Sequence, residues 1–288
     1  CGLTTIKRYS GDMDPLVLVL IVAGAASAFC WITSLLTKET SWVDRLWSIV
    51  PVVYVWIFAI AAISAGEDAT RLIVMAVLVT AWGARLTYNF ARKGGYTGME
   101  DYRWAILRGR MTKWQFQIFN LLFIVLYQNA LLVLISLPAY IAWQHPTAFT
   151  GWDAAFATLF AALLVGETVA DQQQWRFHKE KSAAGGTLEP GFLTSGLFAY
   201  SRHPNFFFEQ AQWWVFYAIG AVALVADGGS WLNWTIVGAA LLTVLFIGST
   251  IFTESITASK YPAYAEYQRT TSMLLPLPRR RTKTRETV

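Results

Sequence analysis

Residues 15–36 read PLVLVLIVAGAASAFCWITSLL and contain no charged side chain. An α-helix needs about 20 apolar residues to cross the ~30 Å hydrocarbon core of a bilayer. The whole 288-residue chain is also apolar, with 55% hydrophobic and only 14% charged residues, whereas soluble domains carry roughly 25% charged residues. The sequence therefore predicts a polytopic helical membrane protein and excludes disordered, collagen-like and disulfide-scaffold classes.

Apolar runs of spanning length recur along the chain. They lie at 15–36, 42–64, 70–91, 113–143, 152–172, 204–226 and 231–257. We find no internal repeat or low-complexity linker, so we expect residues 1–288 to form a single all-α membrane domain, a seven-transmembrane-helix bundle. The long fourth run holds Gln128 and Asn129 near its middle, and we expect these amides to bond neighbouring helices.

Basic residues indicate the orientation of this bundle. The loops and ends on one side carry 18 of the 23 Lys and Arg residues, whereas the other side carries only Lys7, Arg8 and Arg71. The positive-inside rule then places the N-terminus outside and the C-terminal tail in the cytoplasm. The net charge of +5 thus reflects topology, and we expect no nucleic-acid partner and no obligate protein partner. The tail run Arg279–Arg281 is expected to contact anionic lipid headgroups.

Ionisable residues at membrane depth gather on the cytoplasmic side. Each such residue costs about 2.5 to 3.5 kcal/mol to insert and so requires a partner, a cavity or a function. Those in the cytoplasmic half are Asp44, Arg45, Arg85, Glu167, Asp171, Glu209 and Glu254. We expect them to surround a shared polar cavity that opens to the cytoplasm.

Helical spacing arranges polar residues in three stripes, since residues three, four and seven apart share a helix face. The stripes are Trp82, Arg85, Asn89 and Arg92; then Glu167, Asp171, Gln174 and His178, continued by Lys179; and Asn205 with Glu209. A large anionic ligand would suit the nearby cations, which are Arg85, Arg92, Lys93, Arg103, Arg176, Lys179 and Arg202. A positive-inside loop is the alternative explanation for about half of these cations.

Residues 200–209 read YSRHPNFFFE. Pro204 favours a helix start, and Asn205 and Glu209 then point the same way. Further motifs are VDRLW at 43–47, WGARL at 82–86, ADQ at 170–172, GLF at 196–198, YPAYAEYQ at 261–268 and LLP at 274–276. With these motifs the chain resembles the membrane-bound steroid 5α-reductase family, including its bacterial, DUF1295-like branch.

The resemblance implies a seven-helix bundle of the bacterial inner membrane that takes NADPH from the cytoplasm and a flat lipid substrate from the bilayer. It implies cofactor contacts at Arg85, Asp171, Asn205 and Glu209, with Glu254 closing the pocket. The stripes and the basic loops add further candidate cofactor-binding residues, which are Asn89, Arg92, Arg176, His178, Lys179, Tyr200, Arg202 and His203. We expect no metal site.

The chemistry expected from this resemblance is reduction of the carbon-carbon double bond of a 3-oxo-Δ4 steroid or a similar lipid enone. Hydride transfer to the β carbon requires a donor that polarises the ketone. Asp44, a carboxyl at membrane depth, is the expected donor in its neutral form, and Trp82 and Tyr88 are the other candidate catalytic residues. A salt bridge from Asp44 to Arg45 or Arg85 is the alternative role.

A second enzyme class shares the RHPN block at 202–205. Membrane methyltransferases that modify isoprenylcysteine or phospholipid carry it too, so an S-adenosylmethionine-dependent methyltransferase is the alternative function. The segments at 43–47 and 82–86 resemble reductases, and the many cations suit a pyrophosphate with a 2′-phosphate. A receptor or transporter without chemistry is disfavoured, because the intramembrane polar residues stay in one half of the bilayer.

Overall fold

The computed structural model describes residues 13–98 and 100–280. Lys7, Arg8 and Arg281 lie outside the described residues. Within the described ranges all regular elements are helical, and the one β-bridge joins Ser201 to Ser272. The predicted all-helical class is therefore confirmed.

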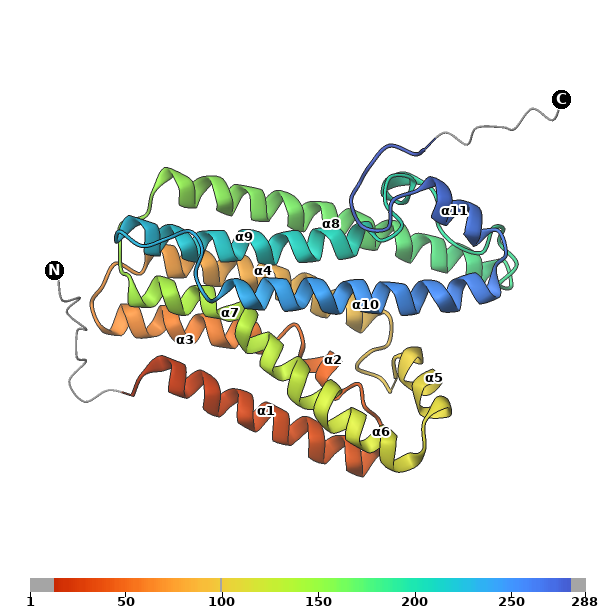
Figure 1. Cartoon of the computed structure of the whole chain (residues 1–288), viewed down its shortest axis with the longest axis horizontal. Helices are drawn as coiled ribbons and strands as arrows, with labels where there is room; N and C mark the ends of the chain where they lie inside the picture. Colours follow the sequence, from red (N-terminus) through yellow and green to blue (C-terminus); the bar gives the residue numbers. More distant parts are fainter. Residues whose placement is uncertain (1–12, 99, 281–288) are drawn as a thin grey trace.

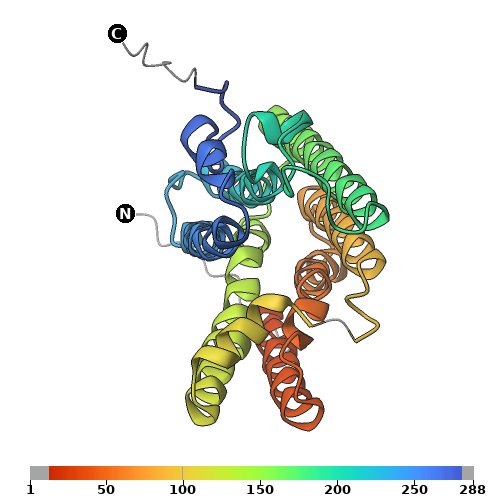
Figure 2. The same ribbon diagram turned by 90° about the vertical axis from the view of Figure 1, so that its right-hand side faces the viewer.

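The long helices run side by side along the main axis of the molecule (Figure 1). They are α1 (Pro15–Thr37), α3 (Val50–Ser64), α4 (Thr70–Arg92), α7 (Gln128–Gln144), α8 (Gly151–Ala183), α9 (Pro204–Ala226) and α10 (Ile236–Lys260). Shorter elements are α2 (Trp42–Leu46), α5 (Tyr102–Arg110), α6 (Lys113–Phe119), the π-helix η1 (Asn120–Tyr127), the 3₁₀ helix η2 (Gly196–Ala199) and α11 (Tyr264–Thr270). Viewed along the bundle, α1 and α6 splay away from the group formed by α4, α8, α9 and α10 (Figure 2).

Six helical segments of the described chain are long and apolar enough to cross a membrane. They are Pro15–Thr37, Trp42–Ser64, Thr70–Arg92, Lys113–Gln144, Gly151–Ala183 and Ile236–Lys260. The expected sixth run corresponds to α9, which is not among these six and which packs against α7, α8 and α10. Polar residues near the start of α9, Glu209, Gln210 and Gln212, are buried in the protein, so this helix belongs to the centre of the bundle.

Two predicted spans differ in shape from simple helices. Helix α8 has 33 residues and is about 50 Å long at 1.5 Å per residue, so it is longer than a ~30 Å hydrocarbon core. The fourth span is built from α6, η1 and α7 in succession. Within it, Phe119, Phe123 and Tyr127 stack with ring centroids 5.0 and 5.4 Å apart. We call these three rings the aromatic ladder.

Close helix contacts depend on glycine at the centre of the bundle. A Cβ added at Gly220 of α9 would lie 2.5 Å from the carbonyl oxygen of Pro138 in α7, and one at Gly238 of α10 would lie 2.4 Å from that of Leu134. Small residues let membrane helices approach each other in this way. Helix α7 is therefore held closely by both α9 and α10.

We expect Gly220→Ala to lower the free energy of unfolding by about 1 to 3 kcal/mol, because the added methyl overpacks this contact. The measurement is unfolding of the purified protein in a detergent titration. Gly24→Ala on α1 is the matched control, since a Cβ there meets nothing within 4 Å and the variant reports the change in helix propensity alone. Equal effects of the two substitutions would contradict close packing at Gly220.

Candidate active site

Arg85 is the centre of a buried ionic cluster between three helices. Its Nη2 lies 2.7 Å from Glu167 Oε1 of α8 and 3.2 Å from Glu209 Oε2 of α9, and its Nη1 lies 2.6 Å from Asp171 Oδ2. All four side chains are at least nine-tenths buried. The three stripes expected from helical spacing thus meet at this point. We call the three acids the carboxylate cluster.

Neutral donors add further hydrogen bonds to this cluster. Trp82 Nε1 donates to Glu209 Oε2 at 2.9 Å, and Gln212 Nε2 donates to Glu167 Oε2 at 2.6 Å. Trp82 is fully buried and packs edge-on against Trp213, with ring centroids 4.9 Å apart. Three carboxylates share a single guanidinium, so the cluster can accept further donors from a ligand, such as hydroxyl or ammonium groups.

Beside the cluster lies a group of basic side chains that we call the basic rim. Its members are Arg92, Lys93, Arg176, His178 and Lys179. Arg92 bonds Asn89 Oδ1 at 2.6 Å and Gln172 Oε1 at 2.8 Å, and its guanidinium lies 4.9 Å from the Trp175 ring centroid. In residues 13–98 and 100–280, the side chains of Lys93, Arg176 and Lys179 have no hydrogen-bond or ion-pair partner.

The charge of Lys93 links the rim to the cluster. Burial lowers the pKa of the Lys93 ammonium, Asp171 opposes this shift, and Arg92 and Arg85 add to it. Lys93 is also close enough to interact electrostatically with His178. Cations that repel each other and form no ion pair within the described residues are suited to bind a phosphorylated ligand.

The RHPN block at 202–205 is held by Glu254 of α10. Arg202 Nε and Nη2 lie 2.6 and 3.0 Å from the two Glu254 oxygens, and His203 Nε2 lies 3.0 Å from Oε1. Gln268 and Tyr264 also donate to this carboxylate, at 2.8 and 3.2 Å. Burial and the neighbouring Glu254 raise the pKa of Tyr264, so its phenol stays protonated as a donor. We call this arrangement the Glu254 node.

The C-terminal segment reinforces the node. Backbone N–H groups of Arg202 and His203 donate to the carbonyls of Ser272 and Met273, at 2.8 and 3.1 Å. The neighbouring Asn205 side chain is half-buried and has no partner within the described part of the chain. Helix α9 therefore begins at a fixed position and presents one unpaired amide.

A cavity of about 470 Å³ includes Phe206, near the start of α9, in its lining. Residues of α2, α5, α6, η1, α7, α9 and α10 line it, and most of them are aromatic or aliphatic. The aromatic ladder forms one wall, and Phe206 of α9 forms part of another. The polar lining residues are Asp44, Arg103, Gln128 and Ser249.

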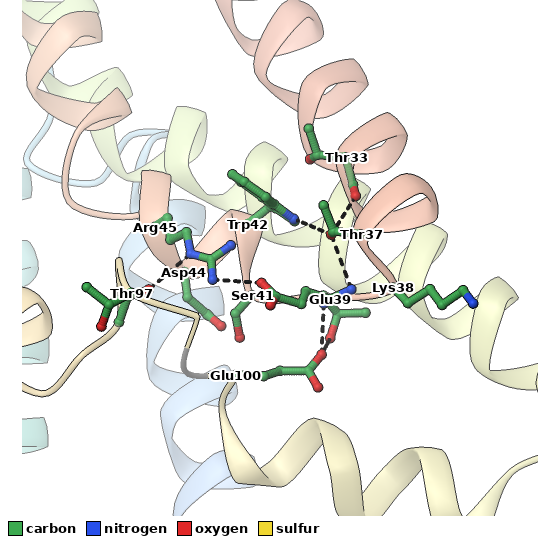
Figure 3. Close-up of polar contacts among 12 residues, drawn as sticks. Thr33, Thr37, Lys38, Glu39, Ser41, Trp42, Asp44, Arg45, Thr97 and Glu100 are labelled. Atoms are coloured by element: carbon green, nitrogen blue, oxygen red, sulfur yellow. Dashed lines mark hydrogen bonds and ion pairs between the residues drawn. The ribbon is translucent and has the colours of Figure 1, made fainter.

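Asp44 lines this cavity, where Arg103 interacts with it electrostatically, and it forms no salt bridge to Arg45 or Arg85 in the described structure. Its Oδ2 accepts a hydrogen bond from Trp104 Nε1 at 3.2 Å. Arg45 bonds Glu39 at 2.8 Å and the carbonyl of Gly95 at 3.0 Å, and Figure 3 shows Arg45 joined to Glu39 and not to Asp44. The alternative of a salt bridge to Arg45 or Arg85 is therefore not what the structure contains.

Nearby, Glu100 fixes helix α5 to the α1–α2 loop. It accepts hydrogen bonds from Thr40 N at 2.9 Å and from Arg108 Nη2 at 2.7 Å. Burial raises the pKa of Glu100, but these hydrogen bonds outweigh it and bring the pKa below its usual range. Helix α5, which contributes Arg103, Trp104 and Leu107 to the cavity lining, is thus tied to the α1–α2 loop.

The family model for a protein of unknown function, DUF1295, matches residues 30–271. The chain belongs to the DUF1295 family. An uncharacterized protein of Schizosaccharomyces pombe is 40% identical over 273 residues, which cover 89% of this chain and 78% of that protein. No solved structure matches the chain. The carboxylate cluster, the cavity and Glu254 all lie within the DUF1295 match.

The candidate catalytic residues of this DUF1295 protein occupy different places. Asp44 lines the cavity, whereas the single N–H donor of Trp82 is occupied by Glu209. Tyr88 is 67% exposed on α4, with Arg92 over its ring at 5.5 Å. Among the three, only Asp44 faces the cavity.

The candidate cofactor residues divide into groups. Asp171 and Glu209 belong to the carboxylate cluster, and Arg85 pairs with it. The candidates at or beside the basic rim are Asn89, Arg92, Arg176, His178 and Lys179. Arg202, His203 and Glu254 bond one another. Tyr200 is 52% exposed. Arg103, expected among the phosphate-binding cations, instead lines the cavity and bonds Ser249 at 2.5 Å.

Sequence reasoning did not identify Trp104, Ser249 or Gln128 as cavity residues. Gln128 and Asn129 were noticed as polar residues in an apolar run, and this was the signal that could have located the cavity. Asn129 of α7 donates to the carbonyl of Val125 in the preceding η1 at 2.8 Å, and its side chain also interacts with Cys30 of the neighbouring α1. Gln128 bonds no neighbouring helix in the described structure, so the expectation for this residue is wrong.

Proposed function

We propose that this DUF1295 protein is an NADPH-dependent reductase of the membrane-bound steroid 5α-reductase type. Its substrate is a 3-oxo-Δ4 steroid or a similar lipid enone. The observation that carries the proposal is the Asp44 carboxyl on the wall of a 470 Å³ aromatic cavity. Phe206, which follows the RHPN block directly, lines the same cavity. A flat apolar substrate with one ketone fits such a lining.

The topology that we propose has seven spans, with α9 as the sixth in chain order. Helix α1 begins at one end of the bundle and α11 lies at the other (Figure 1), as an odd number of crossings requires. The proposed orientation places the α1 start outside and α11 in the cytoplasm of a bacterial inner membrane. The basic rim and the opening of the site then face the cytoplasm, where the positive-inside rule places cations.

The side chains of the carboxylate cluster and the basic rim are chemically suited to NADPH. The carboxylate cluster offers acceptors for ribose hydroxyls, and the unpartnered amide of Asn205 offers both a donor and an acceptor. Lys93, Arg176 and Lys179 form no ion pair in the described ranges and would hold the phosphates. Arg202 and His203 would act through Glu254, which fixes the start of α9, and not by touching the cofactor.

Bound NADPH would supply the hydride. Asp44, as the neutral acid, would donate a hydrogen bond to the substrate ketone, where negative charge develops when the β carbon is reduced. A fixed donor in a site that excludes water stabilises that charge far more than a donor in solution. The aromatic ladder and Phe206 would keep the conjugated system flat and dry.

A methyltransferase is the second candidate, and one observation favours it. Three carboxylates around a single guanidinium leave an excess of negative charge, which suits the ammonium and sulfonium groups of S-adenosylmethionine. The cations of the basic rim, which form no ion pair within the described residues, favour the phosphate groups of NADPH instead. Because the two cofactors differ so strongly in charge, a binding measurement separates them.

We expect the purified protein in lipid nanodiscs to bind NADPH and not S-adenosylmethionine. Arg176→Gln should weaken NADPH binding about tenfold through loss of a charge-assisted contact, a change of about 1.4 kcal/mol. Arg269→Gln is the matched control, since Arg269 pairs with Glu266 on α11. The measurement is an equilibrium titration of each protein with NADPH and with S-adenosylmethionine. Tight binding of S-adenosylmethionine with no NADPH binding would falsify the reductase proposal.

A further inference from the structure

Gln128 is a buried amide that the protein leaves without a partner. It is the first residue of α7, is only 5% exposed and lines the cavity. Within residues 13–98 and 100–280, its side chain makes no hydrogen bond or ion pair. The amide borders a space large enough for a ligand, and its polar atoms reach that space instead of being sealed within the protein. The arrangement therefore points to a group that the ligand supplies.

Gln128 and Asp44 lie toward opposite ends of the aromatic ladder. Trp104, which donates to Asp44, packs against Phe119 with ring centroids 6.3 Å apart. Gln128 directly follows Tyr127, the last ring of the ladder. The cavity thus presents a carboxyl near one end of an apolar wall and an amide at the other end.

We propose that Gln128 binds a second polar group of the substrate, at the end remote from the reacting enone. This inference rests on the proposed reductase function. A glutamine amide both donates and accepts, so it satisfies a ketone or a hydroxyl equally well. An alkyl chain at that position would leave the amide without a hydrogen bond, so a substrate that carries one there should bind more weakly. The substrate class is therefore a flat lipid enone with an oxygen substituent at its far end.

The test uses two 3-oxo-Δ4 steroids that differ only at the far ring, one with a ketone at C17 and one with a methylene there. Their equilibrium binding to the full chain in nanodiscs is measured both without nucleotide and with saturating NADP⁺. Wild-type protein should bind the diketone about tenfold more tightly, and Gln128→Leu should bind both steroids equally. A third steroid, with a hydroxyl at C17, tests the variant Gln128→Glu. Its carboxylate only accepts hydrogen bonds when ionised, so this variant should bind the C17 hydroxyl more tightly than the C17 ketone.

Controls separate recognition from a structural role. Gln128→Leu should not lower the melting temperature, because the amide has no protein partner to lose. Gln144→Leu makes the same substitution near the other end of α7, where the amide bonds Tyr140 and does not line the cavity, and should keep the tenfold preference.

Equal binding of the two steroids by wild-type protein overturns the role of Gln128 and leaves the reductase proposal standing. Binding of neither steroid under both nucleotide conditions overturns the two proposals together. A large fall in melting temperature for Gln128→Leu and Gln128→Glu alike would also overturn the inference, since it would make the amide structural.

Discussion

Asp44→Leu is expected to lower turnover of a 3-oxo-Δ4 steroid about a hundred- to a thousandfold, which corresponds to about 2.7 to 4 kcal/mol for one preorganised donor. Asp44→Asn should retain part of the activity, because its amide can still donate to the ketone. NADPH affinity should change little in both variants. The measurement is the initial rate of NADPH oxidation at saturating steroid.

The environment of Asp44 makes this result specific. Arg45 and Arg85 have other carboxylate partners, so Asp44→Leu leaves no arginine unpaired, and the melting temperature should stay close to that of wild-type protein. Asp68→Asn, in the α3–α4 loop, is the control for a carboxyl far from the cavity. Normal turnover by well-folded Asp44→Leu would contradict the catalytic role of this residue.

Glu254→Ala is expected to lower the free energy of unfolding by roughly 3 to 5 kcal/mol, because it leaves the buried guanidinium of Arg202 without its carboxylate. Glu254→Gln should cost less, since its amide oxygen still accepts from Arg202 or His203. Unfolding in a detergent titration measures both. NADPH binding should weaken in parallel, because Asn205 loses its fixed position at the start of α9.

Glu266→Gln is the control for Glu254→Ala: it removes a carboxylate of an exposed pair on the adjacent α11 and should leave stability unchanged within error.

One outcome for Glu254→Ala would assign the Glu254 node another role. If Glu254→Ala lost NADPH binding while its stability stayed that of wild-type protein, Glu254 would be a direct cofactor contact, as the sequence resemblance implies, and not a structural anchor.

Local periodicity predicted the parts of the site that one helix face determines. Arg85 meets Asp171 because the stripes on α4 and α8 each follow a spacing of three and four residues. Tyr88 is three residues from Arg85, yet it lies at the flank of that stripe and faces outward. Spacing alone does not decide which flank faces the protein.

Contacts between distant segments could not be read from the sequence. Arg202 is separated from Glu254 by 52 positions, and Arg71 from Asp153 by 82. Arg71, counted among the outer loop cations, is in fact 3% exposed and paired with Asp153 at 2.7 Å. The sequence of either partner alone carries no information about such a pair.

The position of Gln128 depends on backbone geometry that a hydropathy pattern does not contain. The eight residues of η1 form a π-helix just before it, and i→i+5 bonding changes the angular step that a helical wheel assumes. Gln128 therefore faces the cavity instead of a neighbouring helix. Helix lengths and apolar character were predictable because they depend on local composition alone.

The most direct test of the reductase proposal follows a labelled hydride. NADPH carrying deuterium at the transferable position of its nicotinamide is incubated with the purified protein and a 3-oxo-Δ4 steroid, and the product is analysed by mass spectrometry and NMR. We expect one deuterium at the carbon β to the ketone and a solvent-derived hydrogen at the α carbon. Unreduced steroid, or a reduced steroid without deuterium at the β carbon, would contradict the proposal.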